Sequence, residues 1–330
     1  MQARSTPGLV TVFGGSGFVG RYTVRALARD GWRVRVALRR PHLVPELRVM
    51  GEVGQIELFQ ANVRMSESIA EAVRGADAVV NLVGALFESG RQSFQKLHVD
   101  AAREIADAAA AEGATQLVQM SAIGADISSS AVYARTKAEG EVAVRAAFPM
   151  ATVLRPSVIF GEEDQFFNRF AAMTNLSPAL PLIGGGKTLF QPVYVGDIGD
   201  AVARVLASEE ARGRTYELGG PGIYSFKTLM EIMLGEIGRR RVLVPIPFDI
   251  AEAMGAAAQM TTMVGLPPPL TTDQVKMLRH DNVVSSGAHT LASLGMTPTA
   301  LEAVIPTYLW KYRSGGQFAQ PEAANAVKVS

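Results

Sequence analysis

Three glycines spaced three residues apart interrupt an apolar run near the start of the chain. Gly14, Gly17 and Gly20 follow residues 9–13, which have the composition of a buried strand, and they precede a helical pattern. A turn from strand to helix through glycines points backbone N–H groups and a positive helix end outward, which suits a pyrophosphate. The alternative is a tight turn without a ligand. The residues of this turn predicted to contact a dinucleotide are Gly14, Ser16, Gly17, Phe18, Val19 and Gly20.

A tyrosine and a lysine form the second candidate chemical group. Tyr133 and Lys137 are four residues apart in a segment with a helical pattern, so they share one face of the helix. An ammonium group lowers the pKa of a phenol, so that Tyr133 can pass a proton to or from a carbonyl or an alcohol. Lys137 would also hold the nicotinamide ribose. This spacing is common by chance, but here it follows Ser121, at the carboxyl end of a predicted strand.

Two arginines stand at the position that distinguishes one dinucleotide from another. In sites selective for NAD, an acidic side chain about 20 residues past the glycines binds the ribose 2′-hydroxyl. Arg39 and Arg40 occupy that place here. A guanidinium binds a 2′-phosphate through two hydrogen bonds, and no carboxylate repels it. The sequence therefore predicts NADPH as the cofactor, and the alternative is a solvated strand end.

The ends of other predicted strands complete the candidate cofactor site, because parallel α/β sheets bind ligands at the carboxyl ends of their strands. Residues that follow the third strand are expected at the adenine edge, and the end of the fourth strand is expected beneath the cofactor. The remaining predicted contacts are Asn62, Val63, Leu82, Val83, Gly84, Ser121, Ala122, Tyr133, Lys137, Pro156, Ser157 and Val158.

Strands and helices alternate regularly through the first half of the chain. Buried strands are predicted at residues 9–13, 34–38, 56–59, 78–84, 116–121 and 152–156. Helices are predicted between them at residues 19–30, 65–73, 94–112 and 133–148. This alternation implies parallel pairing with right-handed crossovers. The predicted fold class is α/β, a doubly wound parallel sheet of the Rossmann type with a smaller, mainly helical C-terminal region.

The regular pattern weakens after residue 160, and it divides the chain into three regions. Residues 1–160 are expected to form the NADP(H)-binding core, residues 161–244 the late Rossmann and substrate-side segments, and residues 245–330 a helical docking region with a tail. The acidic run at 162–164 is expected to start a helix at 165–175 rather than bind a metal. Asp197 is expected to cap a helix at 198–206, and residues 178–186 to form an irregular loop.

The last region differs from the rest in composition. A helix rich in alanine and methionine is predicted at residues 250–263, and prolines 267–269 end it. So apolar a helix is covered either by its own domain or by a partner, and both possibilities stay open. Residues 315–330 have the composition of a terminus that is disordered or ordered by a partner.

Charge and cysteine content exclude several functions. The chain has 32 Lys and Arg against 31 Asp and Glu, so its net charge of +1 gives no overall attraction to nucleic acid. It has no cysteine, which excludes disulfides, thiolate metal sites and cysteine nucleophiles. No apolar run approaches the roughly 18 residues of a membrane-spanning helix, and residues 1–8 are too short and polar for a signal or transit peptide. We expect a soluble or peripheral protein.

These motifs together resemble the atypical short-chain dehydrogenase/reductase family. The resemblance rests on the glycine turn, the arginine pair, the Tyr133–Lys137 pair and the stretch 155–161, Arg-Pro-Ser-Val-Ile-Phe-Gly. One branch matches more closely, the accessory subunits of respiratory complex I of the alpha-subcomplex subunit nine type. That match lies in residues 128–141, 160–168 and 191–197. The specific motifs run from about residue 9 to 197, with a looser likeness to about residue 312.

The resemblance implies a location and partners. It implies a bound NADPH with a structural role in the peripheral arm of complex I, near its junction with the membrane, and other complex I subunits as partners. The apolar C-terminal region would add contact with lipid headgroups. Without a transit peptide the chain resembles a bacterial form, held peripherally at the cytoplasmic face of the inner membrane.

One departure from the family pattern bears on catalysis. Active relatives carry two or three hydroxyl residues at the end of the fifth strand, whereas here Ser121 is followed by Ala122 and Ile123. If the proton-relay hydroxyl belongs two places after Ser121, Ile123 has replaced it, and Tyr133 and Lys137 persist as cofactor ligands only. Two hypotheses follow: an accessory subunit that holds NADPH without turnover, or a free NAD(P)H-dependent reductase or epimerase.

Overall fold

The chain divides into two compact units, each assembled from segments that are far apart in sequence. The computed structural model describes residues 8–88, 90, 92–259, 261, 268 and 270–318. Unit 1 consists of Met1–Pro156, Val195–Leu218 and Ser285–Thr297, and unit 2 of Ser157–Tyr194, Gly219–Val284 and Pro298–Ser330. The three regions expected from the sequence, 1–160, 161–244 and 245–330, are each one continuous stretch of chain. Each unit of the structure instead combines three separate stretches.

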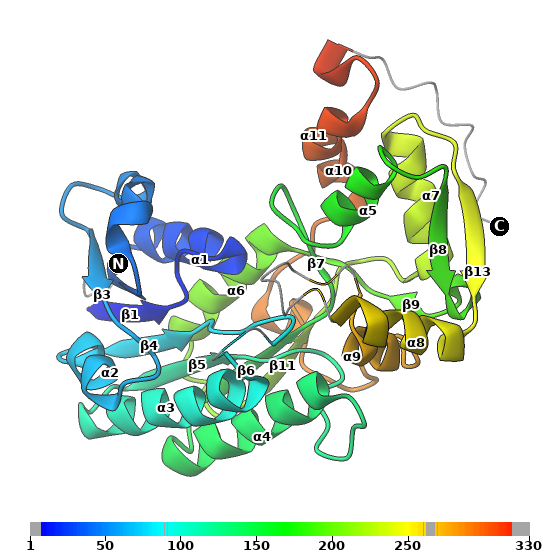
Figure 1. Ribbon diagram of the computed structural model, residues 1–330. Coiled ribbons are helices and arrows are strands. Elements are labelled where there is room, and N and C mark those ends of the chain that lie inside the picture. The colour runs from blue at the N-terminus through cyan, green and yellow to red at the C-terminus, as the bar shows by residue number, and fades with distance from the viewer. Residues whose placement is uncertain are drawn as a thin grey trace. The chain divides into compact units, whose positions relative to one another are not determined.

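Unit 1 is built on a seven-stranded sheet in which every pair of neighbouring strands is parallel (Figure 1). The strand order is β11-β6-β5-β4-β1-β2-β3, so the order reverses between β1 and β4. The predicted doubly wound parallel sheet is therefore confirmed. The strands are β1 (Leu9–Phe13), β2 (Arg33–Leu38), β3 (Ile56–Gln60), β4 (Ala78–Asn81), β5 (Gln116–Met120), β6 (Thr152–Pro156) and β11 (Thr215–Leu218).

Helices cover both faces of this sheet (Figure 1). On one face the buried side chains of Ile69, Ile105 and Val144 share a core cluster with Phe13 of β1, which fixes three helices against the strands. On the other face α1 and α6 lie side by side, and a Cβ at Gly199 would come within 2.7 Å of the Tyr22 carbonyl oxygen. The helices are α1 (Phe18–Arg29), α2 (Ser66–Val73), α3 (Ala101–Ala111), α4 (Val132–Ala147) and α6 (Val195–Leu206).

Two local predictions in unit 1 were wrong in detail. The helix expected at 94–112 begins as a π-helix, η3 (Gln95–Asp100), before α3 continues it. Asp197 does not cap α6 but lies buried inside its first turn, because the helix already begins at Val195. Short 3₁₀ turns complete the unit at η1 (Pro41–Leu43), η2 (Pro45–Met50) and η6 (Ala292–Leu294).

A late segment of the chain returns to unit 1 and covers the edge of its sheet. The backbone N–H of Glu217 in β11 donates to the carbonyl of His289 at 2.8 Å. Tyr216 forms a parallel bridge with His289, and the two rings lie 5.5 Å apart. Residues 285–297 therefore belong with unit 1, although they follow more than sixty residues of unit 2.

Unit 2 combines three two-stranded sheets with short helices. Its core holds the buried rings of Phe160, Phe167 and Phe226, against which Leu301 and Ile305 pack. The strands are β7 (Ile159–Phe160), β8 (Ala179–Ile183), β9 (Leu189–Phe190), β10 (Val193–Tyr194), β12 (Tyr224–Ser225) and β13 (Val242–Ile246). The helices are α5 (Phe167–Met173), η4 (Gly184–Gly186), α7 (Phe226–Glu236), α8 (Phe248–Gln259), α9 (Thr272–Met277), α10 (Leu301–Val304), α11 (Pro306–Leu309), η7 (Trp310–Tyr312) and η8 (Gly316–Phe318).

The region expected as an irregular loop at 178–186 contains a strand. β8 pairs in parallel with β13, and Pro181 lies opposite Val244. A proline is tolerated because each strand of a two-stranded sheet is an edge strand. The sequence predicted a loop here because Pro178 and Pro181 are residues that usually indicate one.

The acidic run at 162–164 precedes a helix, as expected, but α5 covers only Phe167–Met173 rather than 165–175. The Asp164 carboxylate accepts hydrogen bonds from the backbone N–H groups of Phe166 and Asn168, at 2.9 and 3.1 Å. It also accepts one from the Tyr308 hydroxyl, at 2.6 Å. Burial raises the pKa of Asp164. Within the described ranges no cluster of three or more acidic or histidine side chains has a metal-binding arrangement.

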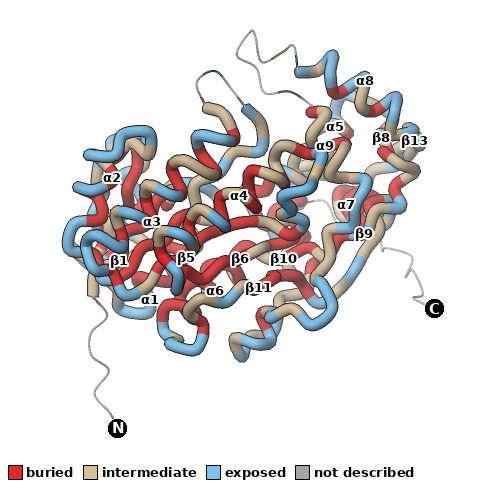
Figure 2. The backbone as a smooth tube through the Cα atoms, turned by 90° about the horizontal axis from the view of Figure 1, so that it is seen from below, coloured by how far each residue is buried: buried red, intermediate tan, exposed pale blue. Residues whose placement is uncertain are grey.

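The apolar helix near the C-terminus begins earlier than expected. α8 starts at Phe248 and is described to Gln259, while much of the rest of the predicted 250–263 helix lies outside the described residues. Figure 2 shows α8 as largely exposed or intermediate, and only Ala251 and Gly255 are buried. Of the tail expected at 315–330, residues 319–330 are outside the described part. Among the helices described, none is both long and apolar enough to span a bilayer.

Candidate functional site

The glycine turn between β1 and α1 has the geometry of an anion cradle. Gly14 has φ +80°, and a Cβ at Gly20 would lie 2.3 Å from the Gly14 carbonyl oxygen, so both positions require glycine. A Cβ at Gly17 would meet only that oxygen, at an ordinary 3.4 Å. Gly17 is exposed and precedes α1, whose first turn has no side-chain cap. The turn therefore offers uncapped backbone N–H groups to an anion.

The end of β4 lies directly against this turn. A Cβ at Gly14 would come 3.1 Å from the Leu82 carbonyl carbon and 3.2 Å from the Val83 nitrogen. The side chain of Asn81 supports the same segment by accepting a hydrogen bond from the Val83 N–H at 3.0 Å. The structure thus brings together two groups of predicted residues, the glycine turn and the segment 82–84. Ser16, Phe18 and Val19 are all partly buried in or after the turn.

A pocket of roughly 380 Å³ lies where β2 and β3 end. It brings together two predicted residues, Arg39 and Asn62, which are 23 positions apart in the sequence. Arg40 does not line it, and Val63 packs on the hydrophobic core instead. The other lining residues, which were not predicted, are Gln60, Ala61, Met65 and Ser68. Gln60 ends β3, and the other three follow it up to the first turn of α2. This position at the carboxyl end of a parallel strand is the signal that could have identified them.

Lys137 is buried beside the end of β4. Its Nζ donates to the carbonyl of Met120 at 3.2 Å, and a Cβ at Gly84 would lie 3.3 Å from the same Nζ. The Nζ also lies 5.9 Å from the centroid of the Tyr133 ring. Burial lowers the pKa of Lys137 to about 8, against the opposing charge of Glu141.

The expected lowering of the phenol pKa is not found. Burial raises the pKa of Tyr133 to about 12. The Lys137 Nζ lies 5.9 Å from the centroid of the Tyr133 ring, and desolvation of the buried phenol is the cause of the raised pKa. Tyr133 and Lys137 do share one face of α4, as predicted, but a phenol with this pKa is a weak general acid at neutral pH.

Ser121 belongs to a buried ionic network that the sequence did not reveal. Its hydroxyl donates to the Glu141 carboxylate at 2.5 Å, and Arg155 also binds this carboxylate. Glu141 lies four residues after Lys137, on the same face of α4, and that spacing is the one available signal. Ala122 is partly buried, and the Ile123 side chain is buried where a second hydroxyl was considered.

His98 is a further buried group of this site that was not predicted. The side chain is 2% exposed and lies in η3. Its Nε2 is 3.3 Å from the backbone nitrogen of Ala85, and its ring packs edge-on against Tyr133 at 5.4 Å. Burial, with a smaller contribution from the charge of Lys137, lowers the pKa of His98 to about 3.

The last three predicted residues fall on both sides of the boundary between the units. Pro156 ends β6 in unit 1, where its carbonyl accepts a hydrogen bond from the Ile123 N–H at 2.9 Å. Ser157 and Val158 open unit 2, and both donate to the Asn282 side chain, at 2.7 and 2.9 Å.

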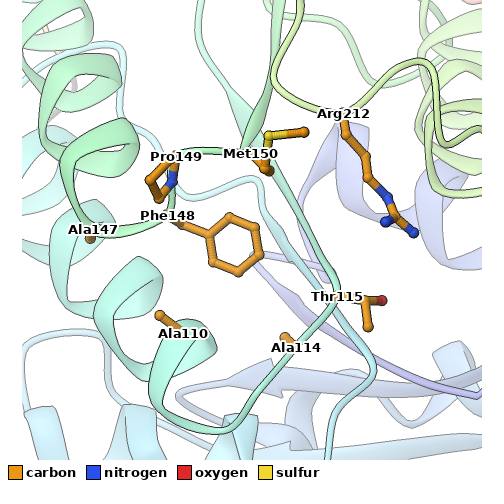
Figure 3. Close-up of a pocket in the computed structure, with 8 residues that line it drawn as sticks. All are labelled: Ala110, Ala114, Thr115, Ala147, Phe148, Pro149, Met150 and Arg212. Carbon is orange, nitrogen blue, oxygen red and sulfur yellow. The ribbon is translucent and has the colours of Figure 1, made fainter.

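A second pocket of unit 1, of roughly 330 Å³, lies at the amino ends of the strands, opposite the glycine turn. Thr115, Met150 and Arg212 line it, and each shortly precedes a strand of the parallel sheet. Figure 3 shows the Phe148 ring in the middle of the pocket and the Arg212 guanidinium turned away from that ring. Polar groups do not converge in this pocket. Parallel α/β sheets bind their ligands at the carboxyl ends of the strands, not at the amino ends.

The fold and this site define a class of dinucleotide-fold proteins, and comparison with known sequences gives the same class. Residues 10–219 match the NAD dependent epimerase/dehydratase family, so the chain belongs to that family. Membership and fold support a nicotinamide dinucleotide as the cofactor. The resemblance to the short-chain dehydrogenases is thereby confirmed.

Within that class, the chain belongs to the family of the complex I alpha subcomplex subunit 9. It is 37% identical over 321 residues to NADH dehydrogenase [ubiquinone] 1 alpha subcomplex subunit 9, mitochondrial, of Arabidopsis thaliana, covering 94% of this chain and 80% of that protein. It is 34% identical to the protein of that name in Mus musculus, covering 94% and 82%.

Solved structures agree on the fold. The triphenylmethane reductase of Citrobacter sp. superposes with a TM-score of 0.72 at 19% identity, covering 91% of this chain and 99% of that one. The structure of gox2253 gives a TM-score of 0.70 at 20% identity, covering 92% and 97%. At such identities the likeness concerns the fold alone.

Proposed function

We propose that this protein is an accessory subunit of respiratory complex I that holds NADPH as a structural ligand and does not turn it over. The observation that carries the proposal is its similarity, over 94% of its length, to subunits that bear this name in a plant and a mammal. A match of this extent includes both units and not only the dinucleotide fold.

The residues of unit 1 fit NADPH. The uncapped end of α1 beside Gly17 suits the pyrophosphate, and Arg39 supplies a cation to the pocket at the ends of β2 and β3. Lys137 and Gly84 adjoin each other, and we assign the nicotinamide ribose to this pair. When bound, the nicotinamide would supply hydride chemistry.

Three features support a structural role for the nucleotide instead of turnover. The pKa of Tyr133 is raised to about 12 by burial. The Ser121 hydroxyl is committed to the Glu141 carboxylate. Ile123 presents an alkyl group two positions after Ser121. These features disfavour a proton relay from Tyr133 through a neighbouring hydroxyl.

The region after residue 245 is proposed to contact other complex I subunits and lipid headgroups, at the cytoplasmic face of a bacterial inner membrane. On α8 the side chains of Ile250 and Met254 are 56% and 47% exposed. Exposed apolar side chains on one helix suit a protein partner or a membrane surface. The net charge of +1 gives no reason to expect a nucleic-acid partner.

The decisive experiment is purification of the tagged full-length protein from its native cells under mild detergent. We expect NADH-oxidising complex I activity to co-elute with it, and chromatography of the released nucleotide to show NADPH at close to one per chain. A small soluble oligomer without complex I subunits would refute the accessory role. Release of NAD alone would refute the choice of NADPH.

A second candidate is a free reductase. A ceramide reductase of Caulobacter vibrioides is 32% identical over 206 residues, covering 62% of both chains, and the Tyr133–Lys137 pair is retained. Single-turnover mixing of the NADPH-loaded protein with long-chain carbonyl compounds tests this candidate. Oxidation of NADPH that disappears in Tyr133→Phe would favour the reductase over the structural role.

A further inference from the structure

We propose that His98 is a positioning residue that ties the turn after β4 to α4, and so fixes the places of Gly84 and Lys137 for the nicotinamide half of the nucleotide. This inference rests on the proposed binding of NADPH. It concerns a side chain that has no part in the glycine turn, the arginine pair or the Tyr133–Lys137 pair.

The imidazole connects two segments through a chain of hydrogen bonds with a defined direction. Its Nε2 lies 3.3 Å from the Ala85 nitrogen, whose N–H must donate, so Nε2 accepts. Its Nδ1 lies 3.1 Å from the Thr136 hydroxyl oxygen. The Thr136 hydroxyl donates to the Val132 carbonyl at 2.9 Å, so Nδ1 carries the proton and donates to Thr136. Only the neutral Nδ1–H tautomer satisfies all three bonds.

Aromatic packing holds the ring in this orientation. Phe94 stacks on His98 with centroids 5.2 Å apart and planes 18° apart. Tyr133 meets both rings edge-on, at 5.4 Å from His98 and 5.7 Å from Phe94. Because the imidazole contacts the tyrosine directly, a change in its orientation would be transmitted to the Tyr133 ring.

The backbone around His98 is fixed against α4 as well. His98 lies in the π-helix η3, and a Cβ at Gly140 of α4 would come within 2.0 Å of the His98 carbonyl oxygen. π-helical turns of this kind are frequent at functional sites. The wide turn and the glycine let the two segments touch, so the imidazole reaches Ala85 without displacing α4.

The consequence is local to one half of the site. Ala85 follows Gly84, and a Cβ at Gly84 would lie 3.3 Å from the Lys137 Nζ and 3.8 Å from the His98 Nε2. Losing the imidazole would leave the Ala85 N–H without its partner and would release the turn beside Lys137. The pocket with Arg39 is formed by the ends of β2 and β3 and does not include these residues. We therefore expect the adenine half of the site to be unaffected.

The test compares two ligands in three variants of the full chain. NADPH spans the whole site, whereas 2′,5′-ADP is the adenine half alone. His98→Phe keeps an aromatic ring but removes the hydrogen bonds, and His98→Gln keeps an acceptor and a donor. Thr136→Val removes one partner and leaves the imidazole in place. Calorimetric titration gives the affinities, and the emission of bound NADPH reports the surroundings of the nicotinamide.

We expect His98→Phe to weaken NADPH by about tenfold, the loss of roughly one hydrogen bond, and 2′,5′-ADP by less than about twofold. Thr136→Val should show the same pattern with a smaller change. It replaces His98→Phe as the test variant if His98→Phe does not fold. His98→Gln should recover most of the affinity and the emission. Equal weakening of both ligands would reveal a merely structural role and overturn the proposal, as would unchanged NADPH binding in His98→Phe and Thr136→Val. Failure of the wild-type protein to bind either ligand would instead refute the proposed function, and the inference with it.

Discussion

Arg155 binds the buried carboxylate of Glu141 through two parallel hydrogen bonds, from Nε at 2.9 Å and from Nη2 at 2.7 Å. The hydrogen bond and charge of Glu141 raise the pKa of Arg155, although its partial burial opposes this. The Arg155 Nη1 also lies 3.7 Å from Glu217, which accepts a hydrogen bond from the Ser285 N–H at 2.7 Å. One network therefore joins α4, β6, β11 and the late segment 285–297.

Breaking this pair should destabilise unit 1. Removing one partner of a buried ion pair costs about 3–5 kcal/mol, and we expect about 2–3 kcal/mol for Glu141→Gln because the Arg155 side chain keeps 26% exposure. Chemical denaturation measures the change. The double variant Glu141→Gln/Arg155→Met should lose less than the sum of the single variants. A loss below about 0.5 kcal/mol for Glu141→Gln would contradict the network.

Arg39 should determine the preference for NADPH over NADH. Hydrogen bonds to a charged group contribute about 1.5–3 kcal/mol, so Arg39→Ala should weaken NADPH by tenfold or more and leave NADH nearly unchanged. Arg40→Ala is the matched control, because Arg40 does not line the pocket. Calorimetry with both nucleotides checks the prediction. Equal weakening of NADPH and NADH would refute it.

A carboxylate at position 17 should prevent stabilisation by the nucleotide. A ligand that binds only the folded state adds about 2.7 kcal/mol at a hundredfold excess over Kd. Gly17→Asp should remove the rise in melting temperature that NADPH produces, because the new charge repels the pyrophosphate. Gly17→Ala is the control, since its Cβ would make only an ordinary contact. A normal NADPH shift in Gly17→Asp would show that the phosphate binds elsewhere.

The stability of the protein should depend on pH through His98. Burial lowers the pKa of His98 to about 3 in the folded state, so the unfolded chain binds the proton more readily. The stability that depends on neutral His98 is therefore fully present above pH 6.5 and is lost as the pH falls toward about 3. The slope approaches about 1.4 kcal/mol per pH unit below pH 6.5, giving a total loss of about 2 kcal/mol by pH 5. Denaturation at a series of pH values gives the free energy of unfolding of wild type and of His98→Gln, and the wild-type value should fall more steeply by this slope. Parallel pH profiles of the two proteins would contradict the prediction.

The exposed face of α8 should be needed for association but not for folding. Deleting residues 245–330 would not test this, because residues 285–297 cover the sheet of unit 1 and Leu301 and Ile305 fill the core of unit 2. Ile250→Glu/Met254→Glu should instead reduce co-purification with complex I activity while the melting temperature and NADPH binding stay unchanged.

Val53→Glu is the control for that pair, because Val53 is fully exposed in unit 1. Full retention of complex I activity by the α8 double variant would exclude this face as the contact. A fall in melting temperature would show that the face is part of the fold.

Several features could be predicted because they depend on residues close together in the sequence. The six strands predicted in the first half of the chain, the glycine turn and the Tyr133–Lys137 face all follow from local patterns of apolar residues and glycines. The turn at Asp164 that leads into α5 depends on backbone groups only two and four residues away. Short-range geometry was sufficient in each of these cases.

Other features were missed because their partners are distant. β8 contains a proline, and only its pairing with β13, some sixty residues later, makes it a strand. His98, buried against the turn after β4 and against α4, looks in the sequence like any polar residue of a helix. The pKa of Tyr133 was misjudged because the charge of Lys137 is visible in the sequence while desolvation is not.

The sequence by itself thus determined the class of fold, the family and the positions of the phosphate turn and of the Tyr133–Lys137 pair, since periodicity and spacing encode them directly. Only the tertiary structure decided that Arg39 and Asn62 share a pocket, that Ser121 is committed to Glu141, and that residues 285–297 complete unit 1. The physical reason is that burial and long-range contact depend on which segments pack together. No local pattern specifies the desolvation that makes His98 neutral or the partner that holds Arg155.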